Sequence, residues 1–216
     1  MITCPMGLRL PILHGVVALL LFAATTPARS ADSAADLAAR GLQECEAGRG
    51  NTDRAVRQQH FEAGQALGEQ AIQLDDNLAD AHFAVVCNMG ELMRLDGESI
   101  RSLLELRRLL AELDRTLQLD PNHVKAMATK GILLCRLPRL VGGDATAGER
   151  MLRRVVAEDP TAINSRLMLA KQCASRGEHA EARAFADSAL QIARAEGRAD
   201  AIAEAQTMLA QLGPAH

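Results

Sequence analysis

The sequence predicts an all-α fold, an α-α superhelix of about four helical hairpins with a carboxy-terminal capping helix. A turn-forming segment recurs at the ends of residues 71–77, 116–122 and 155–161, which read Leu-Asp-Asp-Asn, Leu-Asp-Pro-Asn and Glu-Asp-Pro-Thr. Between these turns, the apolar residues follow the 3.6-residue period of amphipathic helices. The alanine and leucine content, with few β-branched runs, also favours helix. Stacked hairpins of this kind build binding surfaces more often than active sites.

The periodicity predicts four helices in the amino-terminal half of the chain, over residues 34–47, 53–74, 79–94 and 99–119. The first helix ends at a Gly-Arg-Gly-Asn segment, and the third stops near Asp96 and Gly97. Leucines recur at helical spacing in the fourth, which ends before Pro121 because proline disfavours helix in the residue before it.

Five further helices are predicted over residues 124–136, 145–157, 162–175, 179–196 and 199–212. A loop at 137–144, Leu-Pro-Arg-Leu-Val-Gly-Gly-Asp, separates the first two of these, and Asp144 is a good N-cap for the helix that follows. Pro160 marks the next stop. The last helix would cover the open end of the stack.

The first 30 residues read as a secretory signal peptide. Arg9 supplies a positive charge, residues 15–24 form a short apolar core, and Ala28 and Ser30 are small residues before a cleavage site at Ala31. The apolar core is about half of the roughly 20 residues that a membrane-spanning helix needs. We therefore expect a cleaved signal at 1–30, a helical-repeat domain at 31–216 without a membrane span, and a periplasmic or secreted location.

Charge and aromatic content exclude several classes of partner. Residues 31–216 hold 22 basic and 27 acidic residues, a net charge of −5, which gives no indication of nucleic acid or an anionic membrane surface. Only Phe61, Phe83 and Phe185 are aromatic in this part of the chain, which nearly excludes platforms for stacking bases or sugars.

Signatures of catalysis and metal binding are missing from the sequence. No Gly-x-Ser-x-Gly elbow occurs, and no Lys-Ser/Thr pair follows Gly142 and Gly143 as in a phosphate-binding loop. The histidines show no metal-ligand spacing. We therefore expect no enzyme, no metal and no cofactor.

Four cysteines follow the signal, at Cys45, Cys87, Cys135 and Cys173, and all fall on the first helix of a predicted hairpin. Their spacing matches no small disulfide framework, and no Cys-x-x-Cys occurs. The favoured interpretation is four free thiols that serve as small buried apolar side chains. The alternative is a disulfide, which an oxidising compartment permits and which requires facing residues at one level of two helices.

Several small or turn-forming residues fall at the spacing of a known repeat. Pro121 and Pro160 match its terminal proline, whereas Gly131 and Ala170 match the small residue of its first helix. Two small residues of the second helix and the turn at 176–182 also match. Through these residues the chain resembles the tetratricopeptide repeat family. The matching second-helix residues are Ala182 and Ala189.

The chain departs from this pattern at several positions. Met127 and Arg166 stand where a large aromatic is common, Lys130 stands where leucine is usual, and Asp76 replaces a proline. The spacings of 39 and 45 residues between successive turns exceed the 34 residues of the repeat. The loop at 137–144 accounts for the first excess, and about three extra turns in the hairpin at 79–119 account for the second.

A narrower resemblance covers residues 105–195. The loop at 137–144, a helix ending in Glu-Asp-Pro, and Asn-Ser-Arg-Leu-Met-Leu-Ala at 164–170 are similar to the T-component family, the periplasmic helical-repeat proteins associated with TRAP-type solute transporters. Its most specific element is the Gly-Gly-Asp turn at 142–144. This resemblance implies a transporter subunit as partner or a small apolar ligand, although the lipoprotein cysteine common in that family is missing.

The repeat resemblance implies a binding groove lined by the first helix of each hairpin. We expect Phe83, Ile132 and Leu167, flanked by Lys125 and Lys171, to be partly exposed along one concavity. The family positions of the groove are Phe83, Cys87, Lys125, Ile132, Cys135, Asn164, Leu167 and Lys171. The predicted function is that of an exported, non-catalytic scaffold that holds a protein or peptide partner in this groove. A carrier of a small apolar ligand that serves a transporter is the first alternative, and an enzyme is the second.

Overall fold

The computed structural model describes residues 32–97 and 100–213 of the chain, which belong to one compact unit. The predicted signal peptide, 1–30, lies outside the described residues. The described part of the chain is an all-α helical repeat, as predicted. Its elements are α1 (Ala34–Gly50), α2 (Arg54–Leu74), α3 (Ala79–Asp96), α4 (Ile100–Leu119), α5 (Val124–Arg136), the 3-10 turn η1 (Arg139–Val141), α6 (Ala145–Glu158), α7 (Ile163–Ser175), α8 (His179–Ala195) and α9 (Ala199–Gln211).

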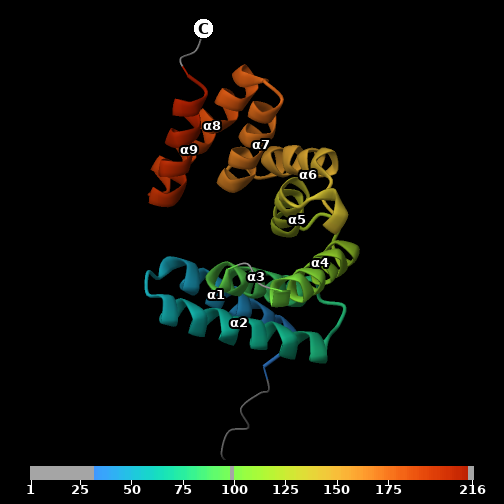
Figure 1. Ribbon diagram of the computed structural model, residues 1–216. Helices are drawn as coiled ribbons and strands as arrows, with labels where there is room; N and C mark the ends of the chain where they lie inside the picture. The colour runs from blue at the N-terminus through green and yellow to red at the C-terminus, as the bar shows by residue number, and fades with distance from the viewer. Residues whose placement is uncertain (1–31, 98–99, 214–216) are drawn as a thin grey trace, which may run out of the picture. The chain divides into compact units, whose positions relative to one another are not determined.

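Consecutive helices pack side by side as hairpins, α1 with α2, α3 with α4, α5 with α6 and α7 with α8 (Figure 1). First helices of successive hairpins also contact each other, α1 with α3 and α5 with α7. Helix α9 takes the place of another first helix, because it packs against both α7 and α8. Its Ala201 and Ala205 share an apolar cluster with Ala189 and Ala193 of α8.

Helices α1, α2 and α3 approach closely where two glycines face their neighbours. A Cβ atom at Gly41 of α1 would lie 2.9 Å from the backbone oxygen of Gly64 on α2. At Gly64, a Cβ atom would lie 2.3 Å from the Oδ1 atom of Asn88 on α3. The fully buried Asn88 uses this space to donate hydrogen bonds from Nδ2 to the carbonyls of Gly41 (2.9 Å) and Ala84 (2.8 Å). One amide therefore links α1 to α3 in the core.

A disulfide joins α1 to α3 between Cys45 and Cys87, whose Cα atoms lie 6.2 Å apart. Four residues further along each helix, Nε of Arg49 donates to Oε1 of the buried Glu91 at 2.8 Å. The covalent bond and the ion pair thus lie one helical turn apart on the same interface. The expectation of four free thiols is wrong for Cys45 and Cys87, because these two side chains face each other at one level.

The carboxy-terminal hairpins pack through the small residues that the repeat pattern assigns. A Cβ atom at Gly131 of α5 would lie 2.8 Å from the Leu152 side chain of α6. Ala170 of α7 is fully buried, as are Ala182 and Ala189 of α8. These contacts confirm the assigned repeat register over α5–α8.

Arg166 stands where the repeat pattern has an aromatic residue, and its side chain makes hydrogen bonds at this position. Its guanidinium donates to the carbonyls of Val156 (3.4 Å), Asp159 (3.4 Å) and Ala162 (3.2 Å), around the end of α6 and the start of α7. The Val156 carbonyl lies in the last turn of α6, where carbonyls lack intrahelical partners, and a cation there also interacts favourably with the negative end of the α6 dipole. Burial lowers the pKa of Arg166.

Candidate functional site

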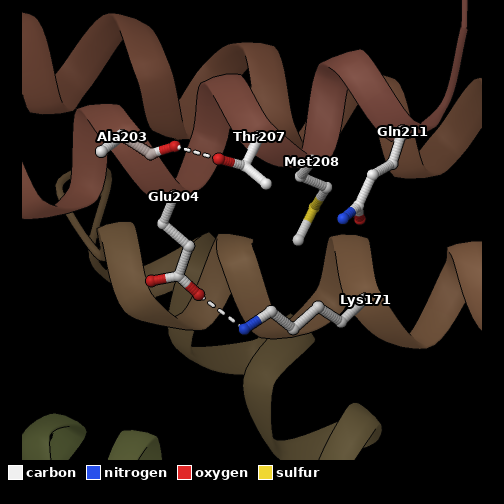
Figure 2. Close-up of a pocket in the computed structure, with 6 residues that line it drawn as sticks. All are labelled: Lys171, Ala203, Glu204, Thr207, Met208 and Gln211. Carbon is white, nitrogen blue, oxygen red and sulfur yellow. Dashed lines mark hydrogen bonds and ion pairs between the residues drawn. The ribbon is translucent and has the colours of Figure 1, made fainter.

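An open groove lies between the first helix of the last hairpin, α7, and helix α9 (Figure 2). Its volume is about 390 Å³, and its lining residues are Lys171 of α7 and Ala203, Glu204, Thr207, Met208 and Gln211 of α9. Met208 is 6% exposed and forms an apolar floor, whereas the other five residues are exposed. The α7–α9 groove therefore combines an apolar base with hydroxyl, amide and charged groups.

A single ion pair spans the α7–α9 groove. Nζ of Lys171 donates to Oε1 of Glu204 at 2.6 Å, and each side chain is 45% exposed (Figure 2). Exposed pairs of this kind contribute about 0–1 kcal/mol to stability. A ligand that offers a carboxylate to Lys171 or a cation to Glu204 can therefore replace the pair at little cost. Thr207 is less available as a donor, since its hydroxyl donates to the Ala203 carbonyl at 2.8 Å.

Helix α5 carries a second accessible face. Lys125, Thr129, Ile132 and Arg136 recur at intervals of four, three and four residues, so they form one stripe along the helix. Lys125 and Arg136 are exposed, whereas Thr129 and Ile132 are half-buried. Ile132 packs at its base against the cluster of Leu152, Met168 and Leu169. The α5 stripe thus carries a cation at each end.

A second hollow, of about 350 Å³, lies where α5 begins beside α6. Its lining residues are Pro121, Met127, Ala147, Arg150, Met151 and Arg154. Arg154 is held by Oε1 of Glu158 at 2.6 Å and Oδ1 of Asn122 at 2.6 Å. Like the α7–α9 groove, this hollow has an apolar base and charged side chains at its rim.

Three of the predicted groove residues are accessible as expected, because Lys125, Asn164 and Lys171 are exposed on the first helices. Lys171 lines the α7–α9 groove, and Lys125 and Ile132 belong to the α5 stripe. Whether these residues contact a partner stays a prediction.

The expected exposure is wrong for Phe83 and Leu167, and Cys87 at a third groove position is buried, as expected of the cysteines. Phe83 (4%), Cys87 (7%) and Leu167 (2%) are buried. Phe83 packs with Val85, Met89 and Leu113 in an apolar cluster, and its ring lies 4.6 Å from that of His123. Leu167 lies in the cluster that joins α7, α8 and α9. Apolar side chains of neighbouring helices cover Phe83 and Leu167, so their apolar character reflects core packing.

Cys87 and Cys135 also have structural partners. Cys87 is bonded to Cys45, and the half-buried Sγ of Cys135 donates to the Ala145 carbonyl at 3.7 Å. A Cβ atom at Gly148 of α6 would lie 2.7 Å from that sulfur. Cys135 therefore fills the contact between α5 and α6. Burial, reinforced by Glu149, raises the pKa of its thiol.

The sequence spacing does not reveal a cluster in which Cys173, Glu178 and Glu181 come within 4.8 Å of one another. Hydrogen bonds from Arg176 to Glu178 and from Arg153 to Glu181 lower the pKa of each carboxyl. Burial and the Glu181 charge raise the pKa of the Cys173 thiol to about 11. Sulfur binds metals as the thiolate. The thiol therefore has to lose its proton before it can bind a metal, and in the metal-free protein the three side chains and the two arginines form a network of hydrogen bonds and charges between α6, α7 and α8.

No protein-family model matches the chain, and no curated protein matches it either. Among solved structures, the chain is similar to TTC0263, a thermophilic TPR protein of Thermus thermophilus. The match has a TM-score of 0.53 and 17% identity, and covers 82% of this chain and 99% of that chain.

Two other solved structures match with lower TM-scores. The MamA RS-1 ArsTM double mutant has a TM-score of 0.47 and 15% identity, over 78% of this chain and 94% of that chain. The structure of pilF from Pseudomonas aeruginosa has a TM-score of 0.48 and 13% identity, over 83% of this chain and 79% of that chain. The TTC0263 match and the packing of small residues show that this chain has the fold of a tetratricopeptide-repeat protein.

Proposed function

We propose that the protein is an exported, non-catalytic scaffold that binds a protein or peptide partner along the accessible faces of α5, α7 and α9. The observation that carries this proposal is the α7–α9 groove, where an apolar floor at Met208 lies beside an exchangeable ion pair. Protein interfaces combine an apolar centre with a polar rim in this way. An extended segment also suits an open groove better than a small molecule does, because drug-sized ligands are mostly buried by their sites.

Two independent features support export. The signal-like segment at 1–30 predicts translocation, and the disulfide between Cys45 and Cys87 belongs in an oxidising compartment. No helix among the described residues is long and apolar enough to cross a membrane. The periplasm or the cell exterior is therefore the proposed location.

A carrier of a small apolar ligand, in the service of a TRAP-type transporter, is the alternative that the Gly142-Gly143-Asp144 turn suggests. The two hollows described above do not favour it, since both are open and have charged side chains at the rim. An apolar ligand site is largely enclosed and lined by hydrophobic side chains. The scaffold is accordingly the function that these surfaces support best.

Affinity capture with groove variants tests the proposal. The bait is the chain from Ala31 onward, and the source is the exported protein fraction of the host. The variant Thr207→Arg fills the α7–α9 groove. Asp187→Arg, a change to the same residue type at another exposed position, on α8, is the control. We expect Thr207→Arg to lose a discrete partner that the wild type and the control retain, at equal melting temperatures. Equal capture by all three proteins would place binding elsewhere.

A further inference from the structure

The net charge of the chain is unevenly distributed along its length. Residues 32–120 hold 9 basic and 17 acidic residues, a net charge of −8, whereas residues 121–158 hold 7 basic and 3 acidic residues, a net charge of +4. The positive segment is the hairpin of α5 and α6 with its connecting loop. A local excess of one sign attracts partners of the other sign and raises their association rate.

All three acidic residues of this hairpin already accept hydrogen bonds from other groups of the protein. Oδ1 of Asp144 accepts from the Ala147 amide and caps α6, Glu149 accepts from Arg153 and Arg176, and Glu158 accepts from Arg154. Among the described residues, four cations of the hairpin make neither a hydrogen bond nor an ion pair with a side chain. These are Lys125, Arg136, Arg139 and Arg150. The positive charge of the hairpin is therefore available to a partner.

An apolar side chain stands out from the loop of this hairpin. Leu140 is 99% exposed and its neighbour Val141 is 40% exposed, both in the 3-10 turn η1. Arg136 and Arg139 lie within four residues of Leu140 along the chain. Exposed large apolar side chains next to one another often mark an interaction site.

The loop holds Leu140 outward by well-defined backbone contacts. The amides of Val141 and Gly143 both donate to the Pro138 carbonyl at 3.0 Å, and the Asp144 amide donates to the Leu134 carbonyl at 3.0 Å. A Cβ atom at Gly143 would lie 1.7 Å from the backbone oxygen of Leu137, so only glycine fits there. Because the loop is ordered by these bonds, presenting Leu140 to a partner requires little further loss of conformational entropy.

We propose that the α5–α6 hairpin docks an acidic amphipathic segment of the partner protein. The partner's apolar side chains pack on Leu140 and Val141, and its carboxylates pair with Arg136 and Arg139. This inference rests on the proposed scaffold function and specifies the partner's chemistry. An apolar anchor beside arginines is also the composition in which interface energy concentrates.

The surrounding chain favours an acidic protein over other polyanions. Residues 32–120, at −8, would repel a membrane or a nucleic acid that extends beyond the hairpin. Two apolar side chains are also too few to anchor a protein stably on a bilayer. Phe61 and Phe83 are buried and Phe185 is half-buried, so the described residues present no exposed aromatic on which bases could stack.

The test uses fluorescence anisotropy with a labelled amphipathic helical peptide of about 20 residues, with leucines on one face and glutamates on the other. Two matched peptides replace the leucines with serine or the glutamates with lysine. The protein variants are Leu140→Ser and the pair Arg136→Glu with Arg139→Glu. Leu104→Ser on α4 and Arg194→Glu on α8 are control variants, because Leu104 is 68% exposed and Arg194 is exposed and unpaired among the described residues.

We expect the acidic amphipathic peptide to bind and the two matched peptides not to. Leu140→Ser and the double arginine variant should each weaken binding at least about tenfold, and the controls should stay within about twofold. No binding of the acidic peptide, or an affinity that Leu140→Ser leaves unchanged, overturns the inference. Tighter binding to phosphatidylglycerol vesicles or to a single-stranded oligonucleotide overturns it too. If captured partners depend on Thr207 and not on Leu140, this inference fails and the scaffold function stands.

Discussion

The two ends of the described chain join their hairpins by different means. Helices α1, α2 and α3 are held by a disulfide, by close approach at glycines, and by the buried polar side chains Asn88 and Glu91. Helices α7, α8 and α9 pack through alanines, with half-exposed ion pairs such as Lys171–Glu204 between them. The difference indicates that the amino-terminal helices serve stability, whereas the carboxy-terminal helices keep polar groups that a partner can engage.

The largest expected effect comes from removing the disulfide. The double variant Cys45→Ala with Cys87→Ala opens a loop that spans 42 residues, and the chain-entropy model gives a loss of about 4 kcal/mol in the free energy of unfolding. Cys135→Ala, outside the bond, should cost much less, since its side chain is only half-buried. Denaturant unfolding measures both. If reductant leaves the wild-type midpoint unchanged, the amino-terminal helices do not depend on this bond.

Glycine replacements sharpen the comparison between the two ends. Gly64→Ala places a Cβ atom against the Asn88 amide, which cannot move without losing buried hydrogen bonds, so we expect a loss of about 1–3 kcal/mol. Gly131→Ala places its Cβ atom 2.8 Å from the buried Leu152 side chain and 3.2 Å from the Gly148 backbone oxygen, contacts that are less close than those at Gly64. The higher helix propensity of alanine, about 1 kcal/mol, applies to both variants, so we expect a smaller loss for Gly131→Ala. Thermal unfolding should therefore separate the two variants. Equal destabilisation would show that both ends are packed equally tightly.

The smallest expected effect concerns the thiol in the carboxy-terminal charge network. The pKa of Cys173 rises from 9.0 to about 11 on folding, because burial and Glu181 disfavour the thiolate. Between these values the unfolded chain loses a proton that the folded chain keeps, so the free energy of unfolding falls as pH rises from about 9 to about 11. Cys173→Ser should flatten this part of the profile measured by urea unfolding. A profile unchanged by the substitution would show that Cys173 is not the group responsible.

The helices were predictable because apolar periodicity, proline stops and small residues all indicate the same register. The predicted bounds differ from the observed ones by three residues or fewer. The pairing of Cys45 with Cys87 was not predictable, since it depends on the level at which α1 and α3 meet. Phe83 and Leu167 hold groove positions of the repeat, but a one-dimensional pattern does not show how fully a neighbouring helix covers them.

The exposure of Leu140 was missed for a related reason. The loop at 137–144 lies outside the repeat pattern, and apolar residues in a loop usually pack back onto the protein. The 99% exposure of Leu140 is seen only in the structure, where hydrogen bonds to the Pro138 carbonyl and the close contact at Gly143 fix the loop backbone. In the sequence, the pair Gly142-Gly143 predicts a turn with a specific backbone conformation. It does not indicate that this turn exposes Leu140.

Hydrogen–deuterium exchange of the chain, free and bound to a captured partner, tests most directly whether binding and stability are divided between the two ends. We expect slow exchange in α1–α3 in both states, because buried hydrogen bonds and the disulfide hold these helices. Partner-dependent protection should appear at 163–175 and 199–211, around the α7–α9 groove, and extend to α5 and the 137–144 loop. Partner-dependent protection confined to α1–α3, with exchange in α7 and α9 unchanged, would contradict this division between binding and stability.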